Sequence, residues 1–229
     1  MSQPGPSAEA LDRVAVEAMK QVESGMRLGL GTGRAAAAFI RRLGEAVKGG
    51  LDVVGVPTSE RSDVLARELG IPLATLAEVN ELSIAFDGAD EVTPDLDLTK
   101  GLGGALLRER VVAHCAKRFV ILVTPEKLVD KLASRTHIPI EVVPFAGPVV
   151  ERGLKALGGE PTPRAGDDGP YHTDNGNLIL DTTLPPLDDA SATDAAIRAI
   201  PGVVDTGLFL GMADEVLVGG PDGVKRLSR

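Results

Sequence analysis

Ionisable side chains are concentrated between residues 87 and 109, in a pattern typical of a proton-transfer site. Six of them follow the apolar run 82–86, in the order Asp87, Asp90, Glu91, Lys100, Arg108 and Glu109. Acids at the end of a predicted strand therefore face a lysine on a glycine-rich stretch and a glutamate on a predicted helix. Carboxylates grouped around a lysine separate their pKa values and so divide the roles of acid and base. The pattern indicates acid–base chemistry on a small anionic substrate.

These acids have two other interpretations. Asp87, Asp90 and Glu91 have the oxygen ligands that a divalent cation takes, but their spacing is not that of an EF-hand and Lys100 would compete with a metal. We therefore expect no metal. Glu109 lies in the first turns of a helix, where an acid often only complements the helix dipole or pairs with neighbouring arginines. Spacing alone favours that structural role for Glu109.

The segment Gly29-Leu30-Gly31-Thr32-Gly33 lies between a predicted strand and a predicted helix. Backbone N–H groups and the helix dipole form an anion site at such a junction. Arg34 occupies the position of the third glycine of a dinucleotide fingerprint, and no Gly-Lys-Ser/Thr follows to make a phosphate loop of the Walker type. The glycines alone are equally consistent with a tight turn. Arg34 favours the anion site, because a guanidinium binds phosphate bidentately.

The composition excludes several classes of protein. The chain has 229 residues, 43% of them hydrophobic, and a net charge of −9, which disfavours a nucleic-acid-binding protein. Cys115 is the single cysteine, so no internal disulfide is possible, and three scattered histidines give no metal-ligand spacing. The start, Met1–Ser7, has no signal-peptide character, and no apolar run approaches the ~20 residues of a membrane span. We expect a soluble cytoplasmic protein without a membrane or nucleic-acid partner.

Strands and helices alternate over the first part of the chain, which predicts a parallel sheet covered by helices on both faces. Ser7 is the expected N-cap of the first helix, whose apolar residues have helical spacing from residue 10 onward. The predicted strands cover residues 26–30, 52–56, 82–86 and 119–123. The later predicted helices cover residues 35–47, 60–69, 105–117 and 126–132, the last with Thr124 as N-cap and Pro125 at its first position.

The pattern changes after residue 133. Predicted strands at 139–145, 160–164, 177–182 and 203–209, with helices at 148–157 and 191–200, give the order β-α-β-β-α-β of a ferredoxin-like subdomain. Residues 167–170 are expected to form a flexible loop and residues 174–177 a turn. A last strand, 213–219, returns to the main sheet. We predict a Rossmann-like catalytic domain of residues 1–133, completed by 210–229, and a ferredoxin-like subdomain of residues 134–209.

Taken together, the motifs resemble type A ribose-5-phosphate isomerase over roughly residues 26–224. The motifs in question are Gly-Leu-Gly-Thr-Gly at 29–33, Val-Pro-Thr-Ser at 56–59, Leu-Gly-Ile-Pro-Leu at 69–73, Asp-Gly-Ala-Asp-Glu at 87–91, Lys-Gly at 100–101, Leu-Arg-Glu at 107–109, Pro-Ile-Glu-Val-Val-Pro-Phe at 139–145, Thr-Asp-Asn-Gly-Asn at 173–177 and Ile-Pro-Gly-Val-Val at 200–204. Each is weak alone, but their number and order make the resemblance specific.

The resemblance implies interconversion of D-ribose 5-phosphate and D-ribulose 5-phosphate through a cis-enediol, with no cofactor and no metal. Glu109 matches the family's proton acceptor. Lys100 and Asp90 match residues that stabilise the oxyanion and handle the hydroxyl proton, and Asp87 matches one that assists ring opening. The substrate-binding positions implied are Gly31, Thr32, Gly33, Arg34, Ala35, Asp87, Gly88, Ala89, Asp90, Lys100, Gly101, Leu102, Gly103 and Lys127. The family is usually dimeric or tetrameric, which implies a homodimer or tetramer here.

Three positions depart from the family pattern. Arg34-Ala35 replaces the usual Ser-Thr, and Leu11 replaces a lysine of the first helix. Leu102 stands where glycine is usual, and a left-handed backbone there would cost a leucine ~1–2 kcal/mol, so we expect a negative φ.

Two other classes of function remain open at this point. A coenzyme A transferase of the same superfold would use Glu109 as a nucleophile and form a covalent thioester, and a sensor would bind sugar phosphate without turnover.

Overall fold

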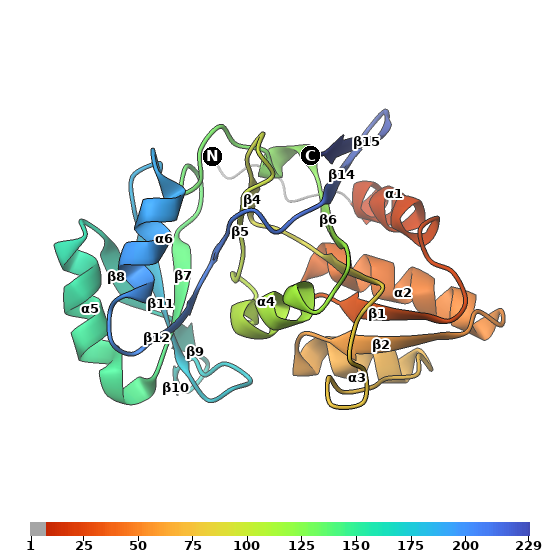
Figure 1. The fold of residues 1–229 in the computed structure, drawn as a ribbon, viewed down its shortest axis with the longest axis horizontal. Helices are drawn as coiled ribbons and strands as arrows, with labels where there is room; N and C mark the ends of the chain where they lie inside the picture. Colours follow the sequence, from red (N-terminus) through yellow and green to blue (C-terminus); the bar gives the residue numbers. More distant parts are fainter. Residues whose placement is uncertain (1–7) are drawn as a thin grey trace.

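The computed structural model describes residues 8–229, which contain a six-stranded central sheet (Figure 1). The strand order is β15-β14-β6-β3-β1-β2. These strands are β1 (Met26–Leu30), β2 (Val53–Pro57), β3 (Ile84–Asp87), β6 (Phe119–Val123), β14 (Glu215–Gly220) and β15 (Gly223–Ser228). Five strands pair in parallel, and β15 runs antiparallel to β14 at the edge. The predicted parallel sheet is confirmed, and so is the return of the last predicted strand to it.

Successive side chains of each strand point to opposite faces of the central sheet, and both faces are buried. One face, which includes Leu28 and Phe86, packs against α1 (Ala8–Met19), α2 (Arg34–Lys48) and α3 (Glu60–Glu68) in a single apolar cluster. The opposite face packs against α4 (Leu106–His114) and against a small antiparallel sheet of order β13-β5-β4. The small sheet consists of β4 (Glu91–Val92), β5 (Leu98–Thr99) and β13 (Leu208–Phe209).

The second sheet is antiparallel throughout and has the order β12-β7-β11-β8, as expected for a ferredoxin-like β-α-β-β-α-β unit. Its elements are β7 (Ile138–Val142), α5 (Gly147–Ala156), β8 (Glu160–Pro163), β11 (Leu178–Thr183), α6 (Ala190–Arg198) and β12 (Val203–Thr206). In Figure 1 it lies at the left with α5 and α6, and α4 lies between the two sheets. Helix α4 contacts β3 of the central sheet and both β7 and β12 of the second. The division into two domains at residues 133 and 209 stays our proposal.

The predicted helix over 126–132 is wrong. Only a 3₁₀ turn, η1 (Pro125–Lys127), forms there, and the hydroxyl of Thr124 donates to the carboxylate of Glu126 instead of capping a helix. The chain then becomes extended because the Val129 N–H bonds to the carbonyl of Val92 on the small sheet. A second 3₁₀ turn, η2 (Pro144–Ala146), precedes α5.

Two other predictions need correction. The predicted strand 203–209 is divided between β12 and β13, which belong to different sheets. Gly207 lies at the division, where an added Cβ would be 2.4 Å from the carbonyl oxygen of Lys100, so the chain turns at a residue without a side chain. Residues 167–170 are not a free loop, because β9 (Ala165–Gly166) and β10 (Gly169–Pro170) pair as a short hairpin.

The predicted cap at Ser7 lies outside the described residues. Within residues 8–229, every helix is too short or too polar to cross a membrane.

Candidate active site

The site lies at the carboxyl ends of β1 and β3, the neighbouring strands between which the connections change direction. Ligands bind at this point in open α/β sheets. The Gly31 N–H donates to the Phe86 carbonyl at 2.9 Å, and the Thr32 N–H donates to Oδ1 of Asp87 at 3.0 Å. A Cβ at Gly31 would lie 2.2 Å from that same oxygen. The glycine therefore allows the Asp87 carboxylate to lie directly against the loop that follows β1.

Lys100 connects two carboxylates at the centre of the site. Its Nζ lies 3.0 Å from Oδ2 of Asp87 and 3.1 Å from Oε2 of Glu109, and it donates to the Gly88 carbonyl at 2.6 Å. Lys100, Asp87 and Glu109 are only 2%, 2% and 3% exposed. Within the described chain, Asp87 Oδ2 and Glu109 Oε2 have no hydrogen-bond partner, so the ammonium is their nearest counter-charge.

Burial and mutual repulsion make these acids unusually basic. Burial, followed by the nearby charge of Asp87, raises the pKa of Glu109 to about 8, although Lys100 opposes the shift. Burial also raises the pKa of Asp87 against the influence of Lys100 and two N–H donors. For Lys100, burial favours the neutral amine, but the two carboxylates outweigh it and raise the pKa, so the lysine remains charged. A carboxylate of this basicity beside a fixed ammonium is suited to abstract a proton from carbon near neutral pH.

Asp90 holds the loop that follows Lys100. Its Oδ2 accepts a hydrogen bond from the Leu102 N–H at 3.1 Å, and burial raises the pKa of Asp90. The non-glycine residues of the described chain with positive φ are Leu96 and Ala133, so Leu102 has the expected negative φ. Leu102 therefore adopts its backbone conformation without strain.

The glycine loop leads directly into α2. Gly33 has φ +104 at the N-cap, and Arg34 is the first residue of the helix. The hydroxyl of Thr32 contacts the hydroxyls of Thr58 at 2.8 Å and Ser59 at 2.7 Å. Backbone N–H groups at a helix start and a guanidinium together form a site for a dianion.

A cavity of about 240 Å³ opens at these elements. It is lined by twelve predicted residues, namely Thr32, Gly33, Arg34, Ala35, Gly88, Ala89, Asp90, Lys100, Gly101, Gly103, Glu109 and Lys127. Three further predicted residues, Gly31, Asp87 and Leu102, are absent from this lining, and Asp87 lies directly behind Lys100. The lining also includes Leu11, Leu122, Val123 and Thr124. Of these, Leu11 was noted in the sequence as a substituted position and Thr124 only as a helix cap, and Leu122 and Val123 had no signal beyond an apolar strand end.

Three ionisable neighbours, Glu91, Arg108 and Arg110, do not line the cavity. Glu91 is fully buried, and its carboxylate accepts the backbone N–H groups of Ala133, Arg135 and Thr136. It anchors a loop and takes no part in the acid cluster in which the sequence grouped it. In the described structure, the ion pairs of Arg108 and Arg110 are with Asp174 and Asp205. The expected pairing of these arginines with Glu109 is therefore wrong. Glu109 forms its ion pair with Lys100 instead.

Comparison with known proteins agrees with this geometry. The family model for ribose 5-phosphate isomerase A (phosphoriboisomerase A) matches residues 54–223. Ribose-5-phosphate isomerase A of Roseiflexus castenholzii is 52% identical over 218 residues, covering 94% of this chain and 93% of that protein. The enzyme of Pyrococcus abyssi is 46% identical over 226 residues, covering 96% and 99%. The chain belongs to the ribose 5-phosphate isomerase A family.

Solved structures of the family superpose closely. Ribose 5-phosphate isomerase A from Methanocaldococcus jannaschii has a TM-score of 0.92 at 47% identity, covering 97% of this chain and 100% of that one. A D-ribose-5-phosphate isomerase in complex with phospho-erythronic acid has a TM-score of 0.95 at 43% identity, covering 98% and 100%. The α/β fold expected from the resemblance is thus confirmed. Enzymes of this family interconvert ribose 5-phosphate and ribulose 5-phosphate in the pentose phosphate pathway.

Proposed function

We propose that this chain interconverts D-ribose 5-phosphate and D-ribulose 5-phosphate, with Glu109 as the base that moves a proton between C2 and C1. The observation that supports these roles is the buried triad of Glu109, Lys100 and Asp87. It lies at a cavity that is also lined by the first residues of α2. Membership of the family supports the reaction, and the geometry is consistent with the role proposed for each side chain. The complex of a relative with phospho-erythronic acid supports a site for phosphorylated sugar derivatives.

In the proposed reaction, Asp87 first assists opening of the furanose ring. The ionised carboxylate of Glu109 then removes the proton from C2 of the open-chain aldose. The C–H electron pair forms the C1–C2 double bond, and the carbonyl electrons move onto O1. The Lys100 ammonium stabilises the resulting oxyanion, and a preorganised cation in a buried site is effective for this purpose. Glu109 returns its proton to C1, and Asp90 moves the hydroxyl proton between O2 and O1, which completes the ketose.

One carboxylate serves both carbons because C1 and C2 are adjacent on one face of the planar intermediate. A positioned base of this kind contributes about 10²–10⁴-fold to the rate. The first residues of α2, with Arg34 and Lys127 at the cavity wall, hold the phosphate at the other end of the sugar. The substrate is then fixed at its phosphate while the reacting carbons lie beside Glu109.

Proton NMR of ribose 5-phosphate in deuterated buffer with a chelator tests this proposal. We expect ribulose 5-phosphate to appear with deuterium at the transferred position, because a carboxylic acid exchanges its proton with solvent. Failure to form the ketose would refute the activity. Ketose formed without any exchange would contradict the expected equilibration of the Glu109 proton with solvent during turnover.

We further propose a cytoplasmic homodimer. The ring of Phe145 on η2 is 96% exposed, Val143 just before η2 and Val149 on α5 are also exposed, and Cys115 is a free thiol. Exposed apolar patches mark interaction surfaces. Light scattering after gel filtration should give twice the chain mass, and Phe145→Ser should shift it toward the monomer. A monomeric wild-type protein would contradict the proposal.

A further inference from the structure

A turn of the second sheet, residues 173–177, is held rigidly by a buried carboxylate. Glu141 on β7 is fully buried, and its Oε1 accepts the Thr173 hydroxyl at 3.0 Å, the Asn175 amide at 3.1 Å and the Asn177 amide at 2.9 Å. Three side chains of the turn thus converge on one oxygen of a single buried residue. The proposed reaction uses none of these residues.

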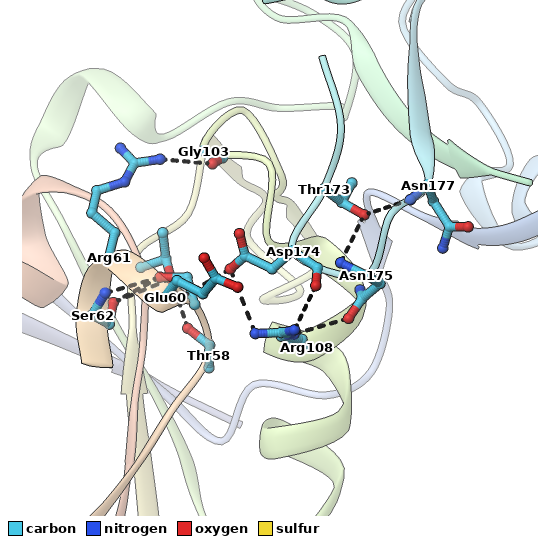
Figure 2. A network of polar contacts seen from close by, with 12 residues as sticks. Thr58, Glu60, Arg61, Ser62, Gly103, Arg108, Thr173, Asp174, Asn175 and Asn177 are labelled. Atoms are coloured by element: carbon cyan, nitrogen blue, oxygen red, sulfur yellow. Dashed lines mark hydrogen bonds and ion pairs between the residues drawn. The ribbon is translucent and has the colours of Figure 1, made fainter. Parts of the chain in front are cut away.

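Residues 173–177 contact two helices outside their own sheet, α3 and α4, which pack against the central sheet (Figure 2). Oδ2 of Asp174 accepts the backbone N–H of Glu60, the first residue of α3, at 2.8 Å. Arg108 on α4 donates from Nη2 to the Asp174 carbonyl at 2.7 Å and from Nε to Oδ1 of Asn175 at 2.9 Å. One turn therefore fixes the start of α3 and the first turns of α4 at the same time.

Helix α4 contributes Glu109 to the lining of the cavity, and the start of α3 contacts the glycine loop that lines it. Arg108 directly precedes Glu109, so the hydrogen bonds from Arg108 to the turn also restrain the backbone that carries the base. On the other side, the N-cap residue of α3, Ser59, contacts the hydroxyl of Thr32 in the glycine loop at 2.7 Å. The turn thus connects the segment that carries the base to the segment proposed to bind phosphate.

We infer that Arg108 and Asp174 are positioning residues, which set the distance between the phosphate loop and Glu109 through the rigid turn at 173–177. The inference rests on the proposed isomerase function. Displacement of a catalytic group by about 1 Å can cost about 10²-fold in rate. Neither residue needs to contact the sugar to have such an effect.

The two flanking arginines differ in how cleanly they can be tested. Arg110 bonds a buried partner, Asp205, which is 1% exposed, so its removal leaves that carboxylate with Arg198 alone among its described ion-pair partners and threatens the fold. The side chain of Arg108 is 37% exposed, and its partners are the carbonyl and carboxylate of Asp174 and the side-chain amide of Asn175. The Asp174 carboxylate is itself 25% exposed and keeps the hydrogen bond from the Glu60 N–H when the arginine is removed. Arg108 can therefore be removed with little loss of stability.

The test measures kcat, KM and melting temperature for five forms of the full chain. These are the wild type, Arg108→Ala, Asp174→Ala, Asp174→Asn and the control Arg67→Ala. Arg67 pairs only with Asp63 within α3 among the described contacts, so it matches the loss of an arginine without touching the turn. Asn at position 174 retains an oxygen that can accept the Glu60 N–H.

We expect Arg108→Ala to lower kcat by about ten- to a hundredfold with KM within about twofold, because the base moves while the phosphate loop stays. Asp174→Ala should also raise KM, since it releases α3 and with it Thr32. Asp174→Asn should restore most of both constants, and the control should match the wild type. All forms should melt well above the assay temperature.

The inference is overturned if Arg108→Ala keeps its kcat, if the control loses as much, or if activity falls only in step with the folded fraction. A wild-type chain without isomerase activity would instead refute the proposed function, so the two failures are distinguishable.

Discussion

The ammonium nitrogen of Lys100 lies 3.1 Å from Oε2 of Glu109, and both side chains are almost completely removed from solvent. The contact has two consequences for a base that acts at carbon. It limits how far burial can raise the pKa of Glu109, so the carboxylate is still ionised in part near neutral pH. It also places a fixed positive charge beside the atoms on which negative charge develops during enolisation.

Replacement of Glu109 by glutamine removes the base without changing the size of the side chain. We expect kcat to fall by about 10²–10⁴-fold while the sugar phosphate still binds. Steady-state kinetics and calorimetric titration with ribose 5-phosphate check the two parts. Glu45→Gln, an exposed change on α2, is the control. Undiminished turnover would assign the chemistry to another group, and a covalent thioester at Glu109 would indicate a transferase.

The pH profile should report the basicity of Glu109. Because a base must be ionised to act and burial raises the pKa of Glu109 to about 8, kcat/KM should increase with pH and level off above that value. The charge of Asp87 contributes to the shift, so Asp87→Asn should move the rising limb to lower pH whatever it does to the maximum rate. A limb that stays in place in the variant would show that the two acids do not interact.

Arg34 should contribute to binding more than to turnover. If its guanidinium carries the phosphate charge at the start of α2, Arg34→Ala should raise KM by at least about tenfold with a smaller change in kcat, as expected for loss of uniform binding. Arg41→Ala provides the control, since Arg41 is exposed further along the same helix. An unchanged KM in Arg34→Ala would reject this role.

Gly31 should tolerate no side chain. A Cβ there would lie 2.2 Å from the Asp87 carboxylate and 2.6 Å from its Cα, so Gly31→Ala must push β3 or the loop aside. We expect a loss of about 1–3 kcal/mol in the free energy of unfolding, together with a loss of activity. Gly147→Ala, where no heavy atom lies within 4 Å of the added Cβ, should leave both unchanged in urea denaturation and in the assay.

Hydrophobic pattern predicted the elements that are buried on both sides. The run Phe119–Val123 is fully buried and forms β6 with the predicted bounds. Strand β15, by contrast, is an edge strand with charged residues such as Lys225 and Arg226, and its exposed side carries no apolar signal. Strands β4 and β5 have two residues each, too few for any periodicity to appear. The predicted helix after Thr124 failed because a tertiary hydrogen bond to Val92 overrode a local capping pattern.

The candidate site was predictable where residue type and position in a motif were sufficient, as for Asp87 at a strand end and Lys100 on a glycine-rich stretch. It was not predictable where side-chain direction decides. Asp90 and Glu91 are adjacent in sequence, yet Asp90 lines the cavity while Glu91 points to the loop at 133–136. The partners of Arg108 lie more than sixty residues away, on a turn of the second sheet, so no local pattern could reveal them.

Strand β14 pairs in parallel with β6, although the whole second sheet separates them along the chain. During synthesis, the central sheet therefore cannot add β14 beside β6 until nearly all of the polypeptide has left the ribosome. Until then β6, which is entirely apolar, is an open sheet edge that can recruit other chains. Fragments that end before Glu215 should consequently aggregate, and a separately supplied C-terminal peptide should rescue them.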